Sequence, residues 1–294
     1  MNWEGIRLRG KGIAHGAISI VNAIASGKGG ALGIRLKVEV DVELFEGRGI
    51  SVKILDADGE NPNLVKKCVE KVLQKFSINH LGARVITKSE IPIAKGLKSS
   101  SAISNATVLA TCAALGKDLD DLDLIRLGVD ASIEAGVSIT GAFDDASASY
   151  FGGFVLTENY SRRIIKLEPS PEHLQVVIYV PEMKLYTKDV NRSNLEKLSH
   201  LVDEVFKLAE KGEYWKALTL NGLIYSAALG FSPQPAIDAL MNGALAAGLS
   251  GKGPAIAAVC EEGTAEIVAS SWSKLQGKVI KTTVNNSKAY GVRI

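Results

Sequence analysis

Three consecutive serines at the start of a predicted helix are the first residues in this sequence that could do chemistry. Ser99, Ser100 and Ser101 follow a turn that contains Gly96, within the stretch Pro-Ile-Ala-Lys-Gly-Leu-Lys-Ser-Ser-Ser-Ala-Ile-Ser-Asn-Ala of residues 92–106. The first turn of a helix leaves about four backbone N–H groups without intrahelical partners and carries partial positive charge, so it is suited to bind an anion such as phosphate. An ordinary serine-capped helix would use the same residues, and this stretch alone supports both interpretations.

Two adjacent carboxylates are the second candidate. Asp144 and Asp145 stand in a run of small and uncharged residues that reaches Gly153. Aspartate is seldom placed among such residues without a partner or a function. A carboxylate here could also cap the helix that we expect to follow. The capping and functional interpretations are compatible.

Two glycine-rich stretches are the third candidate. In residues 247–255, Gly251 and Gly253 flank Lys252 before a predicted buried strand, a pattern that a plain connection between helix and strand would also show. Residues 9–33 are rich in glycine, which indicates tight turns or a backbone that lies close to a ligand. This second stretch contains neither Gly-x-Gly-x-x-Gly nor Gly-x4-Gly-Lys-Ser/Thr, so we assign no Rossmann or Walker motif.

A framework of strands and helices must bring these segments together. Residues 34–45 alternate between apolar and charged side chains, which predicts a half-buried strand. Apolar residues at helical spacing from Leu64 to Phe76 predict a helix entered through Pro62 and Asn63. Further strands are predicted around 52–54, 85–87, 154–157, 164–167, 174–180, 255–260 and 279–284, and further helices at 102–115, 120–135, 194–209, 214–228, 235–247 and 265–275. This order favours an α+β architecture.

Length and composition limit the class of protein. The 294 residues suggest two domains or one large one, and 46% apolar with 22% charged residues is ordinary for a globular protein. A net charge of +2, without a basic run, gives no support for a nucleic-acid partner. Cys68, Cys112 and Cys260 lie far apart in apolar segments, which favours reduced thiols and the cytoplasm. The sequence has no apolar stretch long enough for a membrane span, so we expect no membrane partner.

Residues 92–102 resemble the second motif of the GHMP kinases, the superfamily of galactokinase, homoserine kinase and mevalonate kinase. In that motif a Pro-x-x-x-Gly-Leu-Gly-Ser-Ser-Ala loop wraps the ATP phosphates. The matching residues are Pro92, Gly96, Leu97, Ser99, Ser100 and Ala102. Lys98 replaces the second glycine and Ser101 replaces the alanine. The Lys98 ammonium could add a charge-assisted contact to phosphate.

Other segments extend the resemblance over nearly the whole chain. Counting back from the Gly152-Gly153 pair places Asp145 at the aspartate of the family, and Glu134, eleven residues upstream, at its magnesium-binding glutamate. Residues 247–255 resemble the third, glycine-rich motif. Asn63 begins a tripeptide similar to the turn that lines the adenine pocket, although a capping asparagine would explain it equally well. The first motif of the family borders the acceptor. Its counterpart here contains the weaker candidates His15, Asn22 and Lys28.

The resemblance implies a two-domain α+β GHMP kinase fold with an active site in the cleft between its domains. It implies an ATP-binding domain over residues 1–168 with a left-handed βαβ unit, and a ferredoxin-like domain over residues 169–294. ATP and Mg²⁺ are the implied cofactors. The implied nucleotide-binding residues are Asn63, Pro92, Gly96, Leu97, Lys98, Ser99, Ser100, Ser101, Ala102, Gly251 and Gly253.

The resemblance also implies roles in catalysis. Ser100 and Glu134 would hold Mg²⁺, and Asp145 would act as the base or orient the acceptor hydroxyl. Asp144 would share the metal or bind a substrate hydroxyl.

The variant Gly-Leu-Lys-Ser-Ser-Ser-Ala resembles archaeal-type shikimate kinases within the superfamily. This implies ATP-dependent formation of shikimate 3-phosphate in aromatic amino acid biosynthesis. The cation for the shikimate carboxylate would come from Lys28, Lys98, Lys188 or Lys252. Homoserine is the alternative acceptor. A non-catalytic nucleotide sensor, which would lack the metal-site acid or the Asp145 carboxylate, ranks below both.

Overall fold

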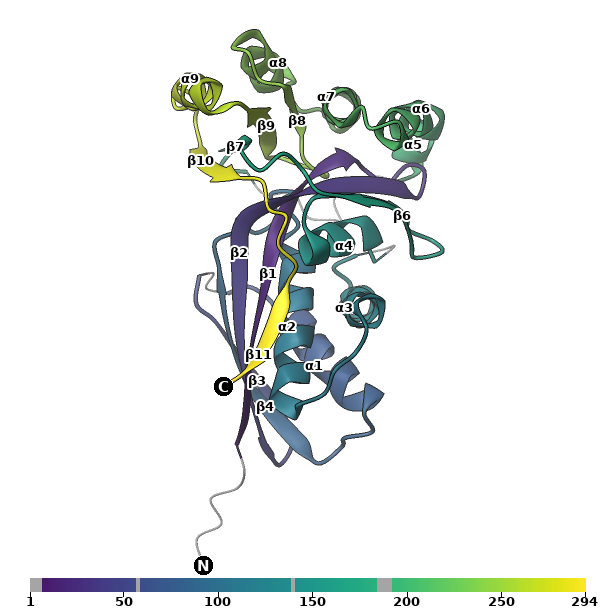
Figure 1. The fold of residues 1–294 in the computed structure, drawn as a ribbon, viewed down its shortest axis with the longest axis vertical. Coiled ribbons are helices and arrows are strands. Elements are labelled where there is room, and N and C mark those ends of the chain that lie inside the picture. The colour runs from purple at the N-terminus through teal and green to yellow at the C-terminus, as the bar shows by residue number, and fades with distance from the viewer. Residues whose placement is uncertain (1–6, 57–58, 139–140, 184–191) are drawn as a thin grey trace, which may run out of the picture.

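The protein consists of a large and a small β-sheet, each covered by helices. The computed structural model describes residues 7–56, 59–138, 141–183 and 192–294. Figure 1 shows the large sheet and its helices in the lower part of the molecule and the small sheet, with its own helices, above them. Mixed strands and helices in two units confirm the predicted α+β class.

The large sheet is built around β2 (Lys28–Glu46), which pairs with three other strands. Its neighbours are β1 (Leu8–Val21) along most of its length, β4 (Leu81–Ser89) near its end and β5 (Phe154–Glu158) near its start. The sheet is completed by β3 (Ile50–Ile54), β6 (Arg163–Glu168) and β11 (Tyr290–Arg293). Alternate residues of β2, including Val38 and Val40, are buried, which confirms the strand predicted at 34–45.

The glycine-rich stretch 9–33 forms β1 and the start of β2, where the sequence had predicted tight turns or backbone near a ligand. The reason is the helix α2 (Ser99–Leu115), which lies directly against β1. A Cβ atom on Gly12 would lie 2.0 Å from the carbonyl oxygen of Ala106. The absence of a side chain at Gly12 therefore lets the backbone of α2 approach the sheet.

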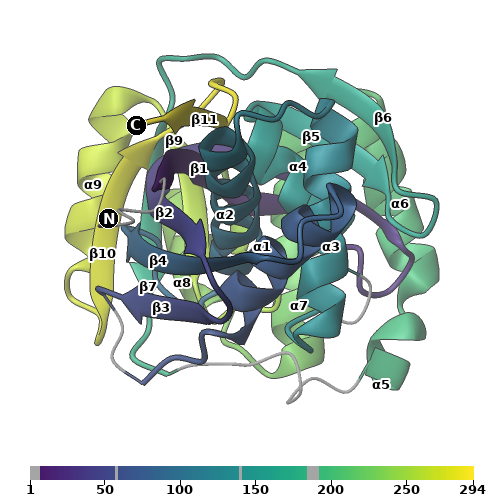
Figure 2. The same ribbon diagram turned by 90° about the horizontal axis from the view of Figure 1, so that it is seen from below.

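Three further helices lie beside α2 and are seen from below in Figure 2. They are α1 (Asn63–Lys75), α3 (Asp121–Glu134) and α4 (Phe143–Phe151). The helices predicted at 64–76, 102–115 and 120–135 are confirmed as α1, α2 and α3. Because α1 connects β3 to its parallel neighbour β4, this part of the chain forms a βαβ unit.

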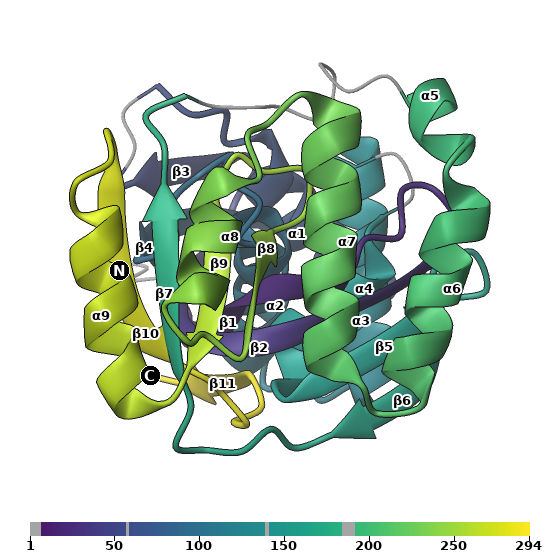
Figure 3. The same cartoon turned by 90° about the horizontal axis from the view of Figure 1, so that it is seen from above.

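The small sheet has the strand order β10-β7-β9-β8 with antiparallel pairing. Its strands are β7 (Gln175–Val180), β8 (Ala246–Leu249), β9 (Ile256–Cys260) and β10 (Lys278–Thr283). Numbered by their order in the chain, they run 4-1-3-2 across the sheet, as in ferredoxin-like domains. Figure 3 shows the helices in front of these strands, and they are α5 (Arg192–Glu196), α6 (Ser199–Glu210), α7 (Tyr214–Leu229), α8 (Gln234–Met241) and α9 (Glu262–Trp272).

Two helix predictions in this half were wrong in extent. The helix predicted at 194–209 is divided into α5 and α6. The helix predicted at 235–247 ends at Met241, because Gly243 adopts a φ of +94° and the buried alanines that follow pair with β9 as β8.

The chain crosses from the large to the small sheet between β6 and β7, next to the predicted domain boundary at 168/169. It then returns, because β11 near the C-terminus pairs with β1 in the large sheet. None of the helices in the described ranges is long and apolar enough to cross a membrane.

Candidate functional site

A cavity of about 480 Å³ lies where the start of α2, the first turn of α4 and the loop after β8 meet. Polar groups from all three segments line it. They are Gly96, Lys98, Ser99, Ser100 and Ser101 before and within α2, Asp144 and Asp145 in α4, and Gly251 and Lys252 after β8. Asn22, Ser132 and Asn159 also contribute to the wall.

The loop before α2 packs tightly against the loop after β8. Gly96 has a φ of +82°, and a Cβ atom there would lie 2.0 Å from the carbonyl oxygen of Ser250. The Ser250 hydroxyl donates to the Gly96 carbonyl at 2.8 Å, and the Ala255 N–H donates to the Lys95 carbonyl at 3.1 Å. Glycine is therefore required at position 96 for both its conformation and its close contact, and the loop is held in place from the small-sheet side.

The N-terminal end of α2 opens into the cavity. The Ala102 N–H makes the first helical hydrogen bond, to the Lys98 carbonyl at 3.0 Å, so the N–H groups of Ser99, Ser100 and Ser101 precede it. The N-cap position is Lys98, and no side chain caps the helix there. The helix start is thus not an ordinary serine cap, and its donors face a space that could hold an anion.

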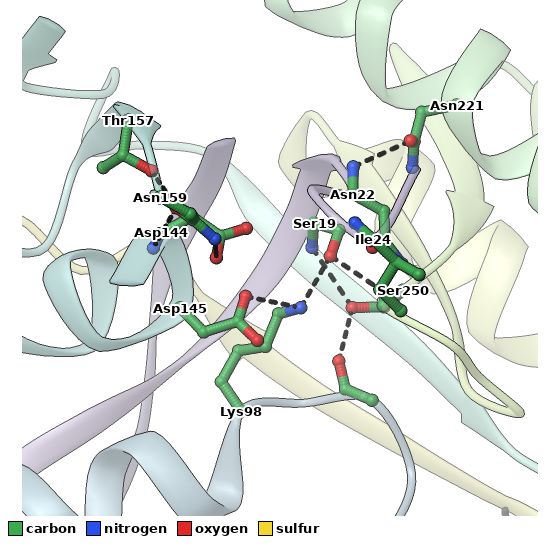
Figure 4. A network of polar contacts seen from close by, with 12 residues as sticks. Ser19, Asn22, Ile24, Lys98, Asp144, Asp145, Thr157, Asn159, Asn221 and Ser250 are labelled. Atoms are coloured by element: carbon green, nitrogen blue, oxygen red, sulfur yellow. Dashed lines mark hydrogen bonds and ion pairs between the residues drawn. The ribbon is translucent and has the colours of Figure 1, made fainter. Parts of the chain in front are cut away.

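Lys98 adopts a left-handed conformation with a φ of +64°, and its side chain is only 5% exposed. Its ammonium lies 2.8 Å from Asp145 Oδ1 and donates to Ser19 Oγ at 2.7 Å (Figure 4). The Gly251 N–H donates to the same Ser19 hydroxyl at 2.9 Å. The ammonium therefore contacts Asp145 and Ser19. The sequence had suggested a contact with phosphate.

Asp144 lies in a different environment from its neighbour. Its side chain is buried, and its Oδ1 accepts a hydrogen bond of 2.8 Å from Asn159 Nδ2. The amide orientation of Asn159 is defined because its Oδ1 accepts from both the Thr157 hydroxyl at 2.7 Å and the Asp144 N–H at 3.1 Å. A Cβ atom on Gly29 would lie 2.3 Å from Asp144 Oδ2, so β2 approaches the carboxyl closely.

This environment changes the acidity of Asp144. Burial, with the nearby Asp145 carboxylate as the second cause, raises the pKa of Asp144 to about 7. The Lys98 charge and the Asn159 hydrogen bond oppose the shift. The two adjacent carboxyls thus differ in their partners, since one contacts a buried cation and the other a neutral amide.

The interpretation of these aspartates as helix caps was wrong. The N-cap of α4 is Ala142, with a φ of +48° and no side-chain cap bond. Asp144 and Asp145 lie inside the first turn of the helix, where the partial positive charge of the helix end favours a carboxylate.

The remaining predicted nucleotide-site residues do not line this cavity. Leu97 and Ala102 are buried in the core. Asn63, Pro92 and Gly253 are each adjacent in the chain to a residue that lines the cavity. Asn63 does not cap α1, which begins after Pro62. Its N–H donates to Asn61 Oδ1 at 2.9 Å. Leu64 and Val65 line the cavity instead.

Glu134 also lies outside the cavity lining. Its side chain is 46% exposed and forms an ion pair with Lys71 of α1. Its neighbours Ser132 and Gly136 do line the cavity, so Glu134 stands close to the rim. Within the described residues, no group of three or more histidine, cysteine or acidic side chains is arranged to hold a metal ion.

The lysines proposed for the substrate carboxylate differ in whether they line the cavity. Lys98 and Lys252 line the cavity, and Lys98 is engaged with Asp145. Lys28 lies outside the lining, 3.6 Å from Asp203. Lys188 lies outside the described residues.

The other two first-motif candidates also separate. His15 lies in β1 outside the cavity, and burial lowers the pKa of its imidazole. Asn22 lines the cavity at the end of β1, where its N–H donates to Asn221 Oδ1 at 2.9 Å and its carbonyl accepts from the Tyr225 hydroxyl at 3.0 Å. Because both partners lie in α7, this contact links the large sheet to the small-sheet helices.

A largely apolar group completes the wall near β3 and α1. It consists of Ile54, Leu64, Val65, Ile93 and Ile103, with Asp56, Asn61 and Thr87 as polar neighbours. Apolar walls with a few polar groups are typical of sites for flat ligand rings.

Sequence reasoning missed Ser19, Thr157, Asn159 and Ser250. Ser19 gave one signal, because it interrupts the apolar run from Ile18 to Val21. Asn159 stands in a polar turn after β5 and gave none.

The arrangement, a serine-bearing helix start opposite two carboxylates between an α/β unit and a ferredoxin-like unit, is that of a small-molecule kinase. Comparison with known families agrees. The description "GHMP kinases N terminal domain" matches residues 63–153, and "GHMP kinases C terminal" matches residues 216–278. The chain belongs to the GHMP kinases. Membership of this kinase family makes ATP the phosphoryl donor.

Similar proteins cover nearly the whole chain. A shikimate kinase of Methanothrix thermoacetophila is 44% identical over 282 residues, which are 96% of each chain. A shikimate kinase of Pyrococcus furiosus is 43% identical and covers 94% of this chain and 100% of its own. Among solved structures, homoserine kinase from Cytophaga hutchinsonii superposes with a TM-score of 0.79 at 22% identity, covering 99% of this chain and 100% of its own, which shows the shared fold.

The raised pKa of Asp144 predicts how stability depends on pH. Below about pH 4 the carboxyl is protonated in both the folded and the unfolded chain. Between about pH 4 and 7 only the unfolded chain ionises, so this group lowers the free energy of unfolding as pH rises, by up to ~1.4 kcal/mol per pH unit. Asp144→Asn, which keeps the shape of the neutral acid, is expected to become more stable relative to wild type across that window and to level off above it.

Urea unfolding at several pH values between 4 and 8 measures this difference. The control is Asp118→Asn, because Asp118 is an exposed aspartate that does not line the cavity. A flat difference for Asp144→Asn would show that Asp144 ionises normally in the folded protein.

Proposed function

We propose that this protein transfers the γ-phosphoryl group of ATP to a hydroxyl of shikimate and forms shikimate 3-phosphate. The observation that carries the proposal is the pair of carboxyls in one cavity with the α2 start, in a chain with shikimate kinases as full-length relatives. The acceptor oxygen attacks the γ-phosphorus, the bond from phosphorus to the β,γ-bridging oxygen breaks, and ADP leaves. The hydroxyl proton passes to a carboxylate.

Asp145 is the group that we assign to that proton or to orientation of the hydroxyl. Its Oδ1 faces Lys98, and Oδ2 is the oxygen that we assign to the acceptor. Asp144, held by Asn159, would hydrogen-bond the neighbouring ring hydroxyl. Adjacent carboxyls with different partners suit a substrate with adjacent hydroxyls, since Asp145 can accept a proton while Asp144, whose pKa is raised to about 7, can donate a hydrogen bond.

The nucleotide would lie along the remaining walls. Backbone N–H groups at Ser99, Ser100 and Ser101 would donate to phosphate oxygens, and the apolar group near β3 and α1 would contact the base. Lys252 would meet the shikimate carboxylate, because it carries a positive charge in the cavity wall.

Mg²⁺ would accompany ATP and supply charge neutralisation of the phosphates, as it commonly does with one or two protein ligands. Ser100 fits this role because it lines the cavity at the helix start. Glu134 fits it only if it leaves Lys71. Exposed ion pairs of that kind contribute about 0–1 kcal/mol, so a divalent cation could readily compete with Lys71 for Glu134. The Ser104 and Ser132 hydroxyls, 3.1 Å apart, connect the second turn of α2 to the end of α3.

Acceptor competition tests the proposed substrate. With MgATP, kcat/KM for shikimate is expected to exceed that for homoserine by ~10,000-fold, because a site that pairs with substrate hydroxyls strongly rejects analogues that lack them. Coupled ADP release measures both, and Lys252→Met is expected to raise the KM for shikimate more than that for ATP. Homoserine turnover equal to or better than shikimate turnover would reject the acceptor but leave the kinase fold intact.

Asp145→Asn is expected to lower kcat by ~100-fold to 10,000-fold while leaving ATP binding nearly unchanged, because it preserves shape but removes the base. Steady-state kinetics and titration with a non-hydrolysable ATP analogue measure the two effects. Asp144→Asn is the matched comparison and is expected to affect the KM for shikimate more than kcat. A nearly normal kcat for Asp145→Asn together with an inactive Asp144→Asn would reverse the assignment.

Ser100→Ala and Glu134→Gln are each expected to raise the Mg²⁺ concentration needed for half-maximal turnover. Since both would bind one ion, the double variant should lose less than the sum of the single losses. Lys71→Met is the control, because it removes the Glu134 ion pair without touching the cavity and should keep normal turnover. Additive losses, or a loss for Lys71→Met equal to that of Glu134→Gln, would argue against a shared ion.

A further inference from the structure

Lys98 occupies a backbone position that is unfavourable for lysine. Its φ of +64° lies in the left-handed region, where a side chain costs free energy and glycine does not. The related kinase motif has glycine at this position, so a residue without strain is compatible with the loop. A strained conformation that persists where glycine would fit suggests that the side chain itself has a function.

The Lys98 side chain joins elements of the large-sheet unit close to the loop after β8. It extends from the start of α2 to Asp145 in α4, and it meets Ser19 of β1. Ser19 is in turn joined to the loop after β8 through Gly251 and Ser250, whose N–H and hydroxyl contact it at 2.9 and 3.2 Å. Figure 4 shows these side chains converging on one point beside the carboxyl pair.

The contact between Lys98 and Asp145 pairs two opposite charges. An ammonium with a side chain only 5% exposed needs a counter-ion, and Asp145 Oδ1 at 2.8 Å provides it. The carboxylate is thereby held in one orientation. A base must be aimed at the hydroxyl before it can accept its proton.

We infer that Lys98 is a positioning residue for Asp145: its ammonium holds the carboxylate in one orientation, aimed at the acceptor, and it does not serve as a phosphate ligand. This inference rests on the proposed function, because it assigns Asp145 to the acceptor hydroxyl. The loop before α2, which would bind the nucleotide, would then also carry Lys98, the residue that orients Asp145 toward the acceptor.

The decisive variant is Lys98→Gly, because glycine removes the ammonium and also relieves the backbone strain at this position. Its kcat is expected to fall by about 100-fold, the scale for loss of a preorganised electrostatic partner. Its Kd for the magnesium complex of a non-hydrolysable ATP analogue should change by less than about 5-fold, since no phosphate contact is lost. Lys98→Met, which keeps the length of the side chain without its charge, is the second variant should the glycine loop fail to fold.

Chemical rescue separates a role of the charge from a role in packing. Butylamine, which replaces the deleted side chain with a free ammonium, is expected to restore part of the kcat of Lys98→Gly. It should not restore Asp145→Asn, which lacks the carboxylate. A structural role for Lys98 would give no rescue and a loss of thermal stability in parallel with the loss of kcat.

Two results would overturn the inference. One is a kcat for Lys98→Gly within a few-fold of wild type, and the other is a loss of analogue affinity as large as the loss of kcat, which would make Lys98 a phosphate ligand. Inactivity of the wild type toward shikimate would instead reject the proposed acceptor. The Lys98 comparison is then made with the acceptor that the wild type phosphorylates, so the two failures remain distinguishable.

Discussion

Close approach of neighbouring segments to backbone positions without a side chain is the constraint on which this structure depends. Gly12 allows α2 to lie directly on β1, Gly96 allows the loop before α2 to touch the carbonyl of Ser250, and Gly29 allows β2 to reach Asp144. Each contact brings two segments within a distance that a Cβ atom would prevent. Together they place a helix start, a loop of the small-sheet unit and a carboxyl pair around one cavity.

The cavity divides two neighbouring carboxyls into unlike groups. Asp145 faces a buried ammonium, whereas Asp144 is buried beside the neutral amide of Asn159. Adjacent residues on a helix point in different directions, so one turn of α4 can place them in separate surroundings. Burial thus raises the pKa of Asp144 beside a carboxyl that contacts an ammonium, without any change of residue type.

Local patterns predicted the parts of the fold in which burial leaves a periodic trace. The alternation over residues 34–45 and the helical spacing from Leu64 to Phe76 each record one buried face, and both elements were confirmed. The strands within residues 9–33 and the early end of the helix predicted at 235–247 were missed because glycine and alanine leave little periodic signal. Their conformations follow from partners far away in the chain, since β1 is covered by α2 and β8 is defined by its pairing with β9.

The sequence by itself determined which chemical groups stand at two helix starts, the serines at 99–101 and the carboxyls at 144–145, because side-chain type and helical position are local properties. Only the tertiary structure decided which partners the polar side chains contact. Lys98 forms an ion pair with Asp145, Asn159 donates a hydrogen bond to Asp144, and Glu134 forms an ion pair with Lys71. These contacts depend on burial and on partners from other elements, and the spacing of residues along one segment encodes neither.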